Sequence, residues 1–318
     1  MSFVPIPSKP ILMQEVGMRD GLQSAGQMVE TDDKVRFLNA LSELGFAKIE
    51  VTSFVSPKAV PLLADAEAVL AQITRHPNVD YVALIPNVRG LERALATDLD
   101  EVNVVMSVSE AHNLANMRMT CDESFAQFAE VVKCAKDLRV NGTLATAFGC
   151  PFVGAIAPSQ VRDWVQRFLD IGIQSITIAD TVGVATPHEV YSLCSIIRER
   201  YPSLPITLHL HNTRGLGITN AYAGIAAGID RFDASLGGIG GCPYAPGATG
   251  NVCTEDLLHS LVQDGFECAV DLDGLIQVAN ELQTLLGQHF PGLVKDSGPR
   301  TRLHPLPASV AERMQRSD

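Results

Sequence analysis

Two histidines separated by one residue, His209 and His211, are the clearest candidates for chemistry in this sequence. Apolar and polar residues alternate through Pro205-Ile-Thr-Leu-His-Leu-His-Asn212, which predicts a strand with one buried face and one face that lines a polar pocket. Side chains two residues apart on a strand project from the same face, so both imidazoles can reach one small volume. Two converging imidazoles indicate a metal site; one functional histidine with a hydrogen-bonded neighbour is the plainer alternative.

Further metal ligands have to come from other parts of the chain, and Asp20 and Asn251 are the candidates. Asp20 follows the first predicted strand, and Asn251 closes a glycine-rich stretch that begins at Gly237. A mixed set of oxygen and nitrogen donors without cysteine favours Mg²⁺ or Mn²⁺, with Zn²⁺ left open. Such an ion could bind a hydroxyl and a carbonyl oxygen of a substrate and polarise both.

Short β-rich stretches alternate with amphipathic stretches along the whole chain. The eight predicted strands are Ile11 to Gly17, Ala47 to Phe54, Tyr81 to Ile85, Glu101 to Met106, Gly142 to Phe148, Ser175 to Ala179, Ile206 to His211 and Arg231 to Leu236. Eight β-then-α units without a break in composition predict a single (β/α)8 TIM barrel over residues 1–290, followed by a C-terminal tail over 291–318. An open doubly wound sheet is the alternative, but no dinucleotide fingerprint follows the first strand.

Catalytic residues of such a barrel lie where strands end, and three further side chains fit this rule. Arg19 ends the first strand and could stabilise the oxygen of an enolate. Glu50 points inward on the second strand, where an ion pair with Arg19 or Lys48 is as good an explanation as catalysis. Cys242 lies in the glycine-rich stretch and could supply a proton to the enolate carbon. Together the residues suit cleavage of a carbon–carbon bond in a β-hydroxyacyl compound, or the reverse reaction.

The bulk properties restrict the class of protein. The chain has 318 residues, 46% of them hydrophobic, and a formal net charge of −12. It can bury a large core, and its acidity argues against a nucleic-acid partner. The first residues do not form a signal peptide and no run reaches membrane-spanning length, so we expect a cytoplasmic protein without a membrane partner. Seven scattered cysteines without Cys-x-x-Cys spacing indicate reduced thiols.

Several motifs resemble those of the 3-hydroxy-3-methylglutaryl-CoA lyase family, in unbroken order over about residues 10–290. They are Glu15-Val-Gly-Met-Arg-Asp-Gly-Leu-Gln23, Ile49-Glu-Val-Thr-Ser-Phe-Val-Ser-Pro-Lys58, Phe148-Gly-Cys-Pro151, Asp180-Thr-Val-Gly183, Gly240-Gly-Cys-Pro-Tyr244, Gly250-Asn251 and Thr254-Glu-Asp256. The resemblance implies a metal-dependent TIM barrel that cleaves an acyl-CoA thioester to acetyl-CoA and acetoacetate. It places metal ligands at Asp20, His209, His211 and Asn251, the enolate contact at Arg19 and proton transfer at Cys242. Gln23, Glu50 and Glu255 are then supporting active-site residues.

The sequence departs from the family's pattern near the substrate. Asn212 and Arg214 stand where the family usually has aspartate and tyrosine, and Gly26 stands where it has a basic residue. These changes bear on which acyl group is recognised and on how the CoA phosphates are held. Arg214, His112 or Arg118 could receive a substrate carboxylate; for each of them a surface ion pair is the plainer alternative.

Three other functions compete with cleavage. A condensing synthase would share the first-strand Arg-Asp and the His-x-His, but such enzymes carry a further C-terminal region. A non-catalytic metal-binding barrel would not need the complete set of candidate residues, and metal hydrolases usually place the His-x-His on their first strand. The sequence leaves open a homo-oligomer, to which the basic tail after residue 291 could contribute.

Overall fold

The computed structural model of the chain describes residues 4, 9–241, 250–307, 309, 310 and 314. Eight of its strands form one closed, parallel sheet in the order β1-β10-β9-β8-β5-β4-β3-β2. These strands are β1 (Leu12–Glu15), β2 (Lys48–Ser53), β3 (Asp80–Leu84), β4 (Glu101–Ser107), β5 (Arg139–Ala145), β8 (Ser175–Asp180), β9 (Ile206–Leu210) and β10 (Arg231–Ala234). The predicted (β/α)8 barrel is therefore confirmed.

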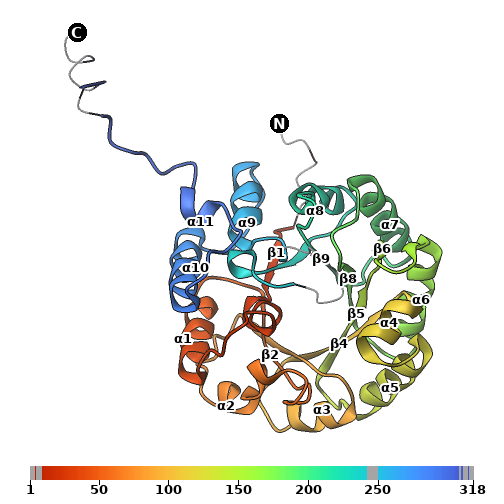
Figure 1. The fold of residues 1–318 in the computed structure, drawn as a ribbon. Helices are drawn as coiled ribbons and strands as arrows, with labels where there is room; N and C mark the ends of the chain where they lie inside the picture. Colours follow the sequence, from red (N-terminus) through yellow and green to blue (C-terminus); the bar gives the residue numbers. More distant parts are fainter. Residues whose placement is uncertain (1–3, 5–8, 242–249, 308, 311–313, 315–318) are drawn as a thin grey trace.

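Helices form the outer ring around the strands (Figure 1). They are α1 (Thr31–Ser42), α2 (Ala66–Leu70), α3 (Val88–Ala94), α4 (Glu110–Met117), α5 (Cys121–Cys134), α6 (Pro158–Asp170), α7 (Pro187–Arg200), α8 (Gly217–Ala226), α9 (Thr254–Gln263), α10 (Leu272–Leu286) and α11 (Val294–Ser297). A capping box begins α7, because Thr186 and Glu189 each bond the other's backbone N–H. No helix of the described part of the chain is long and apolar enough to cross a membrane.

The fifth strand of the barrel differs from the prediction. The sequence placed it over Gly142 to Phe148, whereas β5 begins at Arg139 and ends at Ala145. Thr146 adopts a left-handed backbone with a φ of 56°, which ends the extended run even though the apolar sequence continues. The chain then forms a small antiparallel hairpin, β6 (Gly149–Cys150) and β7 (Gly154–Ala155), that the sequence did not predict.

The alternation along β2 sorts its residues between two environments. Ile49 and Val51 join the apolar core between strands and helices, which agrees with the inward direction predicted for Glu50 between them. Lys48 and Glu50 point into the barrel, where Lys48 pairs with Glu101 on β4. The inward-facing side chains of this strand are therefore charged, and Lys48 is neutralised by Glu101. Glu50 lies closer to the C-terminal end of the barrel, where the candidate site is found.

Candidate functional site

Arg19 and Asp20 lie on a short π-helical turn, η1 (Gly17–Gly21), that directly follows β1. This tight turn aims both side chains over the mouth of the barrel instead of along its wall. The Arg19 guanidinium donates from Nη1 to Asp20 Oδ1 at 2.5 Å and from Nε to Glu50 Oε2 at 2.6 Å. The ion pair considered for Glu50 is thus present with Arg19, while Lys48 is engaged elsewhere.

His209 and His211 come from the C-terminal end of β9 and face each other as their spacing predicted. Their Nε2 atoms are 3.2 Å apart. His209 Nδ1 meets Asp233 Oδ1 on the neighbouring strand β10 at 2.7 Å. A carboxylate behind one ring nitrogen holds the other nitrogen toward the shared space, which is the usual arrangement behind a metal-binding histidine.

Asn251 joins this group from the segment that precedes α9. It pairs with His211 through an isolated antiparallel bridge, and its Nδ2 donates to Asp20 Oδ2 at 2.7 Å. Among the described residues its Oδ1 has no hydrogen-bond partner although it is buried. A buried amide oxygen without a partner is a costly feature unless a cation or another donor uses it.

The charges of the site reinforce one another. Burial alone would raise the pKa of the Asp20 carboxyl, but Arg19 and His209 outweigh it and lower this pKa to about 2. Burial alone would lower the pKa of His209, but the charge and hydrogen bond of Asp233, together with the charge of Asp20, raise it to about 9. Despite its burial, Arg19 has a raised pKa because Glu50 and Asp20 surround it, so it remains a cation.

These residues fit a divalent metal ion. One carboxylate oxygen of Asp20 and one ring nitrogen each of His209 and His211 lie within 4.8 Å of one another. Oxygen and imidazole donors that converge in this way, with a buried amide oxygen close by, suit an ion that accepts mixed O and N ligands. The geometry therefore brings together all four residues that the sequence singled out as ligands.

Two buried carboxyl groups lie beneath the site. Glu255 is fully buried, and both of its oxygens accept the Gly237 backbone N–H at 2.9 and 3.0 Å. Glu15, also fully buried, accepts the N–H groups of Gly17 at 2.6 Å and Leu236 at 2.8 Å. Glu255 thus holds the backbone after β10, and Glu15 ties that segment to the turn that carries Arg19 and Asp20.

The remaining candidates lie in different settings. Gln23 is exposed just beyond η1, and Cys242 falls outside the described residues. His112 is buried, its Nδ1 is 2.6 Å from Ser107 Oγ, and burial lowers its pKa. The role suggested for His112 in receiving a substrate carboxylate stays a prediction. Arg118 is exposed at the end of α4.

Sequence reasoning missed Asp233 and Glu15. Asp233 is an inward-facing acidic residue on a four-residue strand. The criterion that identified Glu50, a charged side chain inside the barrel, could have identified Asp233 as well. Glu15 ends β1, and among the described residues it accepts hydrogen bonds from two backbone N–H groups and the Thr254 hydroxyl, so no pattern of residue types predicts its partners. Its place beside the Arg-Asp pair was the only available hint.

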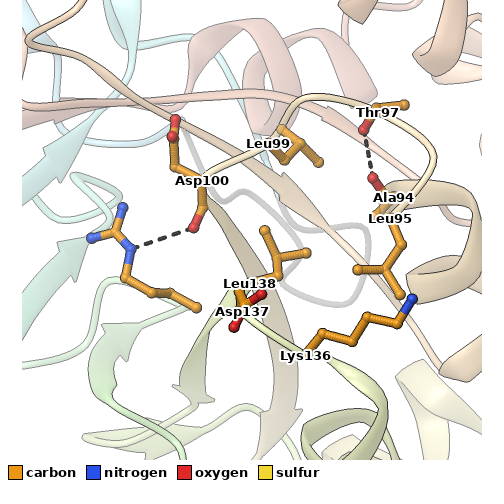
Figure 2. Close-up of a pocket in the computed structure, with 9 residues that line it drawn as sticks. Ala94, Leu95, Thr97, Leu99, Asp100, Lys136, Asp137 and Leu138 are labelled. Atoms are coloured by element: carbon orange, nitrogen blue, oxygen red, sulfur yellow. Dashed lines mark hydrogen bonds between the residues drawn. The ribbon is translucent and has the colours of Figure 1, made fainter.

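A separate cavity lies at the other end of the barrel, where β4 and β5 begin. It has a volume of about 380 Å³, and Leu95, Leu99 and Leu138 line it together with Asp100 and Lys136 (Figure 2). None of the candidate catalytic residues reaches it. The chemistry therefore concentrates at the C-terminal ends of the strands, as in other barrels of this kind.

A closed (β/α)8 barrel with a carboxylate and two imidazoles converging at its C-terminal end defines the class: a TIM-barrel enzyme with a candidate metal centre. The chain belongs to the HMGL-like family, whose model matches residues 10–282. It is accordingly a carbon–carbon lyase of the hydroxymethylglutaryl-CoA lyase type.

Relatives with known activities are similar over nearly their full length. Hydroxymethylglutaryl-CoA lyase YngG of Bacillus subtilis is 39% identical over 91% of this chain and 97% of its own. The (R)-citramalyl-CoA lyase of Chloroflexus aurantiacus is 38% identical over 95% of this chain and 98% of its own. A solved HMG-CoA lyase from Acinetobacter baumannii, in complex with coenzyme A and 3-methylmalate, is 49% identical, has a TM-score of 0.91, and covers 94% of this chain and 98% of its own.

Proposed function

We propose that this enzyme cleaves the C2–C3 bond of 3-hydroxy-3-methylglutaryl-CoA, or of a close branched 3-hydroxyacyl-CoA, to acetyl-CoA and a keto acid such as acetoacetate. The observation that carries the proposal is the convergence of Asp20, His209 and His211 beside the Arg19 guanidinium. This arrangement offers a site for a hydroxyl and a carbonyl oxygen next to a fixed cation.

The reaction is a reverse Claisen step. The C3 hydroxyl loses its proton, its oxygen becomes the keto oxygen of the acid, and the C2–C3 electron pair moves into the enolate of acetyl-CoA. The enolate then takes up a proton at C2. Arg19, positioned by Glu50 and Asp20, stabilises the charge on the thioester oxygen as it develops. We assign the proton at C2 to the Cys242 thiol, because its sequence position places it in the segment that follows the end of β10.

We propose Mg²⁺ or Mn²⁺ as the cofactor, held by Asp20, His209, His211 and Asn251. When bound, such an ion polarises the hydroxyl and carbonyl oxygens of the substrate. Asp20 has a low pKa and stays ionised, so it remains available as a ligand over the physiological range. The charge on Asp20 makes it a weak proton acceptor, and we give it at most a shared role in deprotonating the hydroxyl.

(R)-Citramalyl-CoA is the second candidate substrate. It has one methylene fewer between its carboxylate and the reacting carbon, and its cleavage yields pyruvate in place of acetoacetate. Two observations favour it: the similarity to the Chloroflexus lyase, and the cation that Arg214 adds in the loop after β9. The carboxylate of (R)-citramalyl-CoA lies closer to the reacting carbon than that of 3-hydroxy-3-methylglutaryl-CoA, so a positive charge that binds it has to lie at a different position.

A panel assay tests the proposal. Purified protein is incubated with Mg²⁺ or Mn²⁺ and a set of branched 3-hydroxyacyl-CoA thioesters, and acetyl-CoA and keto acids are quantified. We expect equimolar acetyl-CoA and keto acid from one or two members of the panel, and loss of turnover with a chelator. Absence of acetyl-CoA from every member, with metal bound, would refute the proposed reaction. The keto acid that forms identifies the acyl group.

We propose a cytoplasmic location. The six cysteines in the described part of the chain are all free thiols, which suits a reducing compartment.

A further inference from the structure

Two inward-facing layers of side chains link β2 to β4 across the interior of the barrel. In the layer nearer the start of the strands, Lys48 pairs with Glu101. In the next layer toward the C-terminal end, Asn103 donates from Nδ2 to Glu50 Oε1 at 3.2 Å. The other oxygen of this buried carboxylate, Glu50 Oε2, accepts the Arg19 Nε–H at 2.6 Å. Glu50 therefore holds Arg19 on one side and is itself held by Asn103 on the other.

The amide of Asn103 is fixed in one orientation. Its Oδ1 accepts hydrogen bonds from Asn141 Nδ2 at 2.9 Å and from Thr143 Oγ1 at 2.8 Å, both on β5. A flipped amide would place its N–H donors against the Asn141 donor and its oxygen against the Glu50 carboxylate, so the observed orientation is the one that pairs these groups. The side of the amide that faces Glu50 is therefore a donor.

The support for Asn103 continues along the barrel wall. Asn103, Asn141 and Ser175 are paired in the register of β4, β5 and β8. Asn141 Oδ1 accepts a hydrogen bond from Ser175 Oγ at 2.8 Å, and its Nδ2 also donates to Thr177 Oγ1 at 3.0 Å. All four residues lie on strands, so three strands of the closed sheet set this series of hydrogen bonds. Its free end is the donor that meets Glu50.

We infer that Asn103 is a positioning residue for the carbon–carbon cleavage: by holding the Glu50 carboxylate from β4, it fixes the Arg19 guanidinium where the enolate charge develops. The inference rests on the proposed function, in which Arg19 stabilises that charge. Such stabilisation depends on donors that are oriented before the reaction begins. Without Asn103, one buried oxygen of Glu50 would lose this donor, and the carboxylate would be free to turn away from Arg19.

Asp20 is a weaker support for the same guanidinium. It accepts a hydrogen bond from Arg19 Nη1 at 2.5 Å, but its carboxylate is also a proposed metal ligand. A bound ion would compete with Arg19 for the oxygens of Asp20. Glu50 is outside the group of converging donor atoms formed by Asp20 and the two histidines. The contact with Glu50 is therefore the one that orients Arg19 whether or not a metal ion is bound.

Hydrogen exchange at Arg19 tests the inference without any substrate. In protein labelled with ¹⁵N-arginine, the Nε–H signal of Arg19 is assigned by its loss in Arg19→Met, and its exchange with solvent is measured. Asn103→Leu keeps the approximate volume of the amide but removes the donor, so we expect the exchange to become about tenfold faster.

Tyr81→Phe is the matched control for this measurement. It also deletes a buried hydrogen bond, from Tyr81 Oη to Ser42 Oγ at 2.8 Å, but this bond lies between β3 and α1, outside the barrel interior. Exchange at Arg19 should be unchanged in this variant. Unchanged exchange in Asn103→Leu, or an equal acceleration in both variants, would overturn the inference.

Steady-state kinetics provide the second measurement. Asn103→Leu should lower kcat about tenfold with little change in KM or in Mn²⁺ affinity, because it weakens a contact that acts in the transition state. Its effect should disappear in a Glu50→Met background, which has already lost the carboxylate through which Asn103 acts. A full further loss of kcat in the double variant would show that Asn103 acts by another route, and the inference would fail.

A second substitution covers a failure of Asn103→Leu to fold. Asn103→Ser keeps a hydroxyl that accepts hydrogen bonds from β5 but is too short to reach Glu50, so the same changes in exchange and kcat are expected. If no acyl-CoA of the panel is cleaved, the proposed reaction fails. The exchange measurement needs no turnover, so it then decides whether Asn103 orients Arg19 independently of that result.

Discussion

His209 and Asp233 are paired in the register of β9 and β10, and their side chains meet at 2.7 Å between Nδ1 and Oδ1. The contact fixes which nitrogen of His209 is presented to the space shared with His211 and Asp20. Both residues are held by strands of the barrel wall, so the orientation of the imidazole is a property of the fold. A metal ion would then bind without first having to order this ligand.

Asp233→Asn tests this relationship. The amide keeps the shape of the side chain but removes the charge that supports His209, so we expect the affinity for Mn²⁺ to fall by about 10- to 100-fold. Glu101→Gln is the control, because Glu101 is a buried inward carboxylate at the opposite end of the barrel. Electron paramagnetic resonance of bound Mn²⁺ gives the affinity without turnover. An equal loss in both variants would mean that Asp233 acts only through general stability.

Arg19→Met separates catalysis from structure at the Arg19–Glu50 pair. Methionine keeps most of the apolar volume but removes the cation, so we expect kcat to fall by about 10²- to 10³-fold with a smaller change in KM. Arg93→Met is the control, since Arg93 forms an ion pair with Glu67 that involves no candidate site residue. It should alter the melting temperature at most. A mild effect of Arg19→Met on kcat would identify the pair as structural.

The sequence predicted the parts of the site that depend on a regular repeat. The two-residue spacing of His209 and His211 is enough to place both rings on one strand face. Asp20 and Asn251 could be added because the strands of a (β/α)8 barrel end at the same face, so residues far apart in sequence meet there. The convergence of their donor atoms at the barrel mouth bears out this reasoning about position, and their roles as ligands stay a prediction.

Features without a repeat were not predictable in the same way. The apolar run to Phe148 suggested a longer fifth strand, but the left-handed backbone of Thr146 ends it, and a left-handed threonine has no clear signature in sequence. The η1 turn that orients Arg19 and Asp20 depends on buried acceptors, above all Glu15, whose partners are backbone groups. Such contacts depend on the three-dimensional path of the chain and not on residue type.

Cys242→Ser addresses proton transfer. Serine is nearly the same size but is a much weaker acid than a thiol, so we expect kcat to fall by about 10²- to 10⁴-fold while metal affinity is unchanged. Cys194→Ser serves as the control, because Cys194 is a buried thiol on α7 in the outer ring of helices. Normal turnover of Cys242→Ser would remove this thiol from the mechanism.

The buried carboxyl groups Glu15 and Glu255 predict a pH dependence of stability. Burial raises the pKa of Glu15 to about 8 against the hydrogen bonds of Leu236 and Thr254, and it raises the pKa of Glu255 to about 7. Each group therefore binds a proton more tightly in the folded chain than in the unfolded one. The stabilisation is complete below the unfolded pKa of about 4.5 and is lost as the pH rises through about 7 to 8.

The measurement is the melting temperature between about pH 6 and about pH 9 in the presence of a chelator, so that metal binding does not contribute. The wild-type chain should melt at a lower temperature as the pH rises. Glu15→Gln cannot ionise, so its melting temperature should fall less over the same range even if it starts lower. An equal fall in melting temperature for wild type and Glu15→Gln would contradict the prediction, because it would mean that Glu15 is ionised over the whole pH range. Its three hydrogen bonds would then offset the rise in pKa that burial causes.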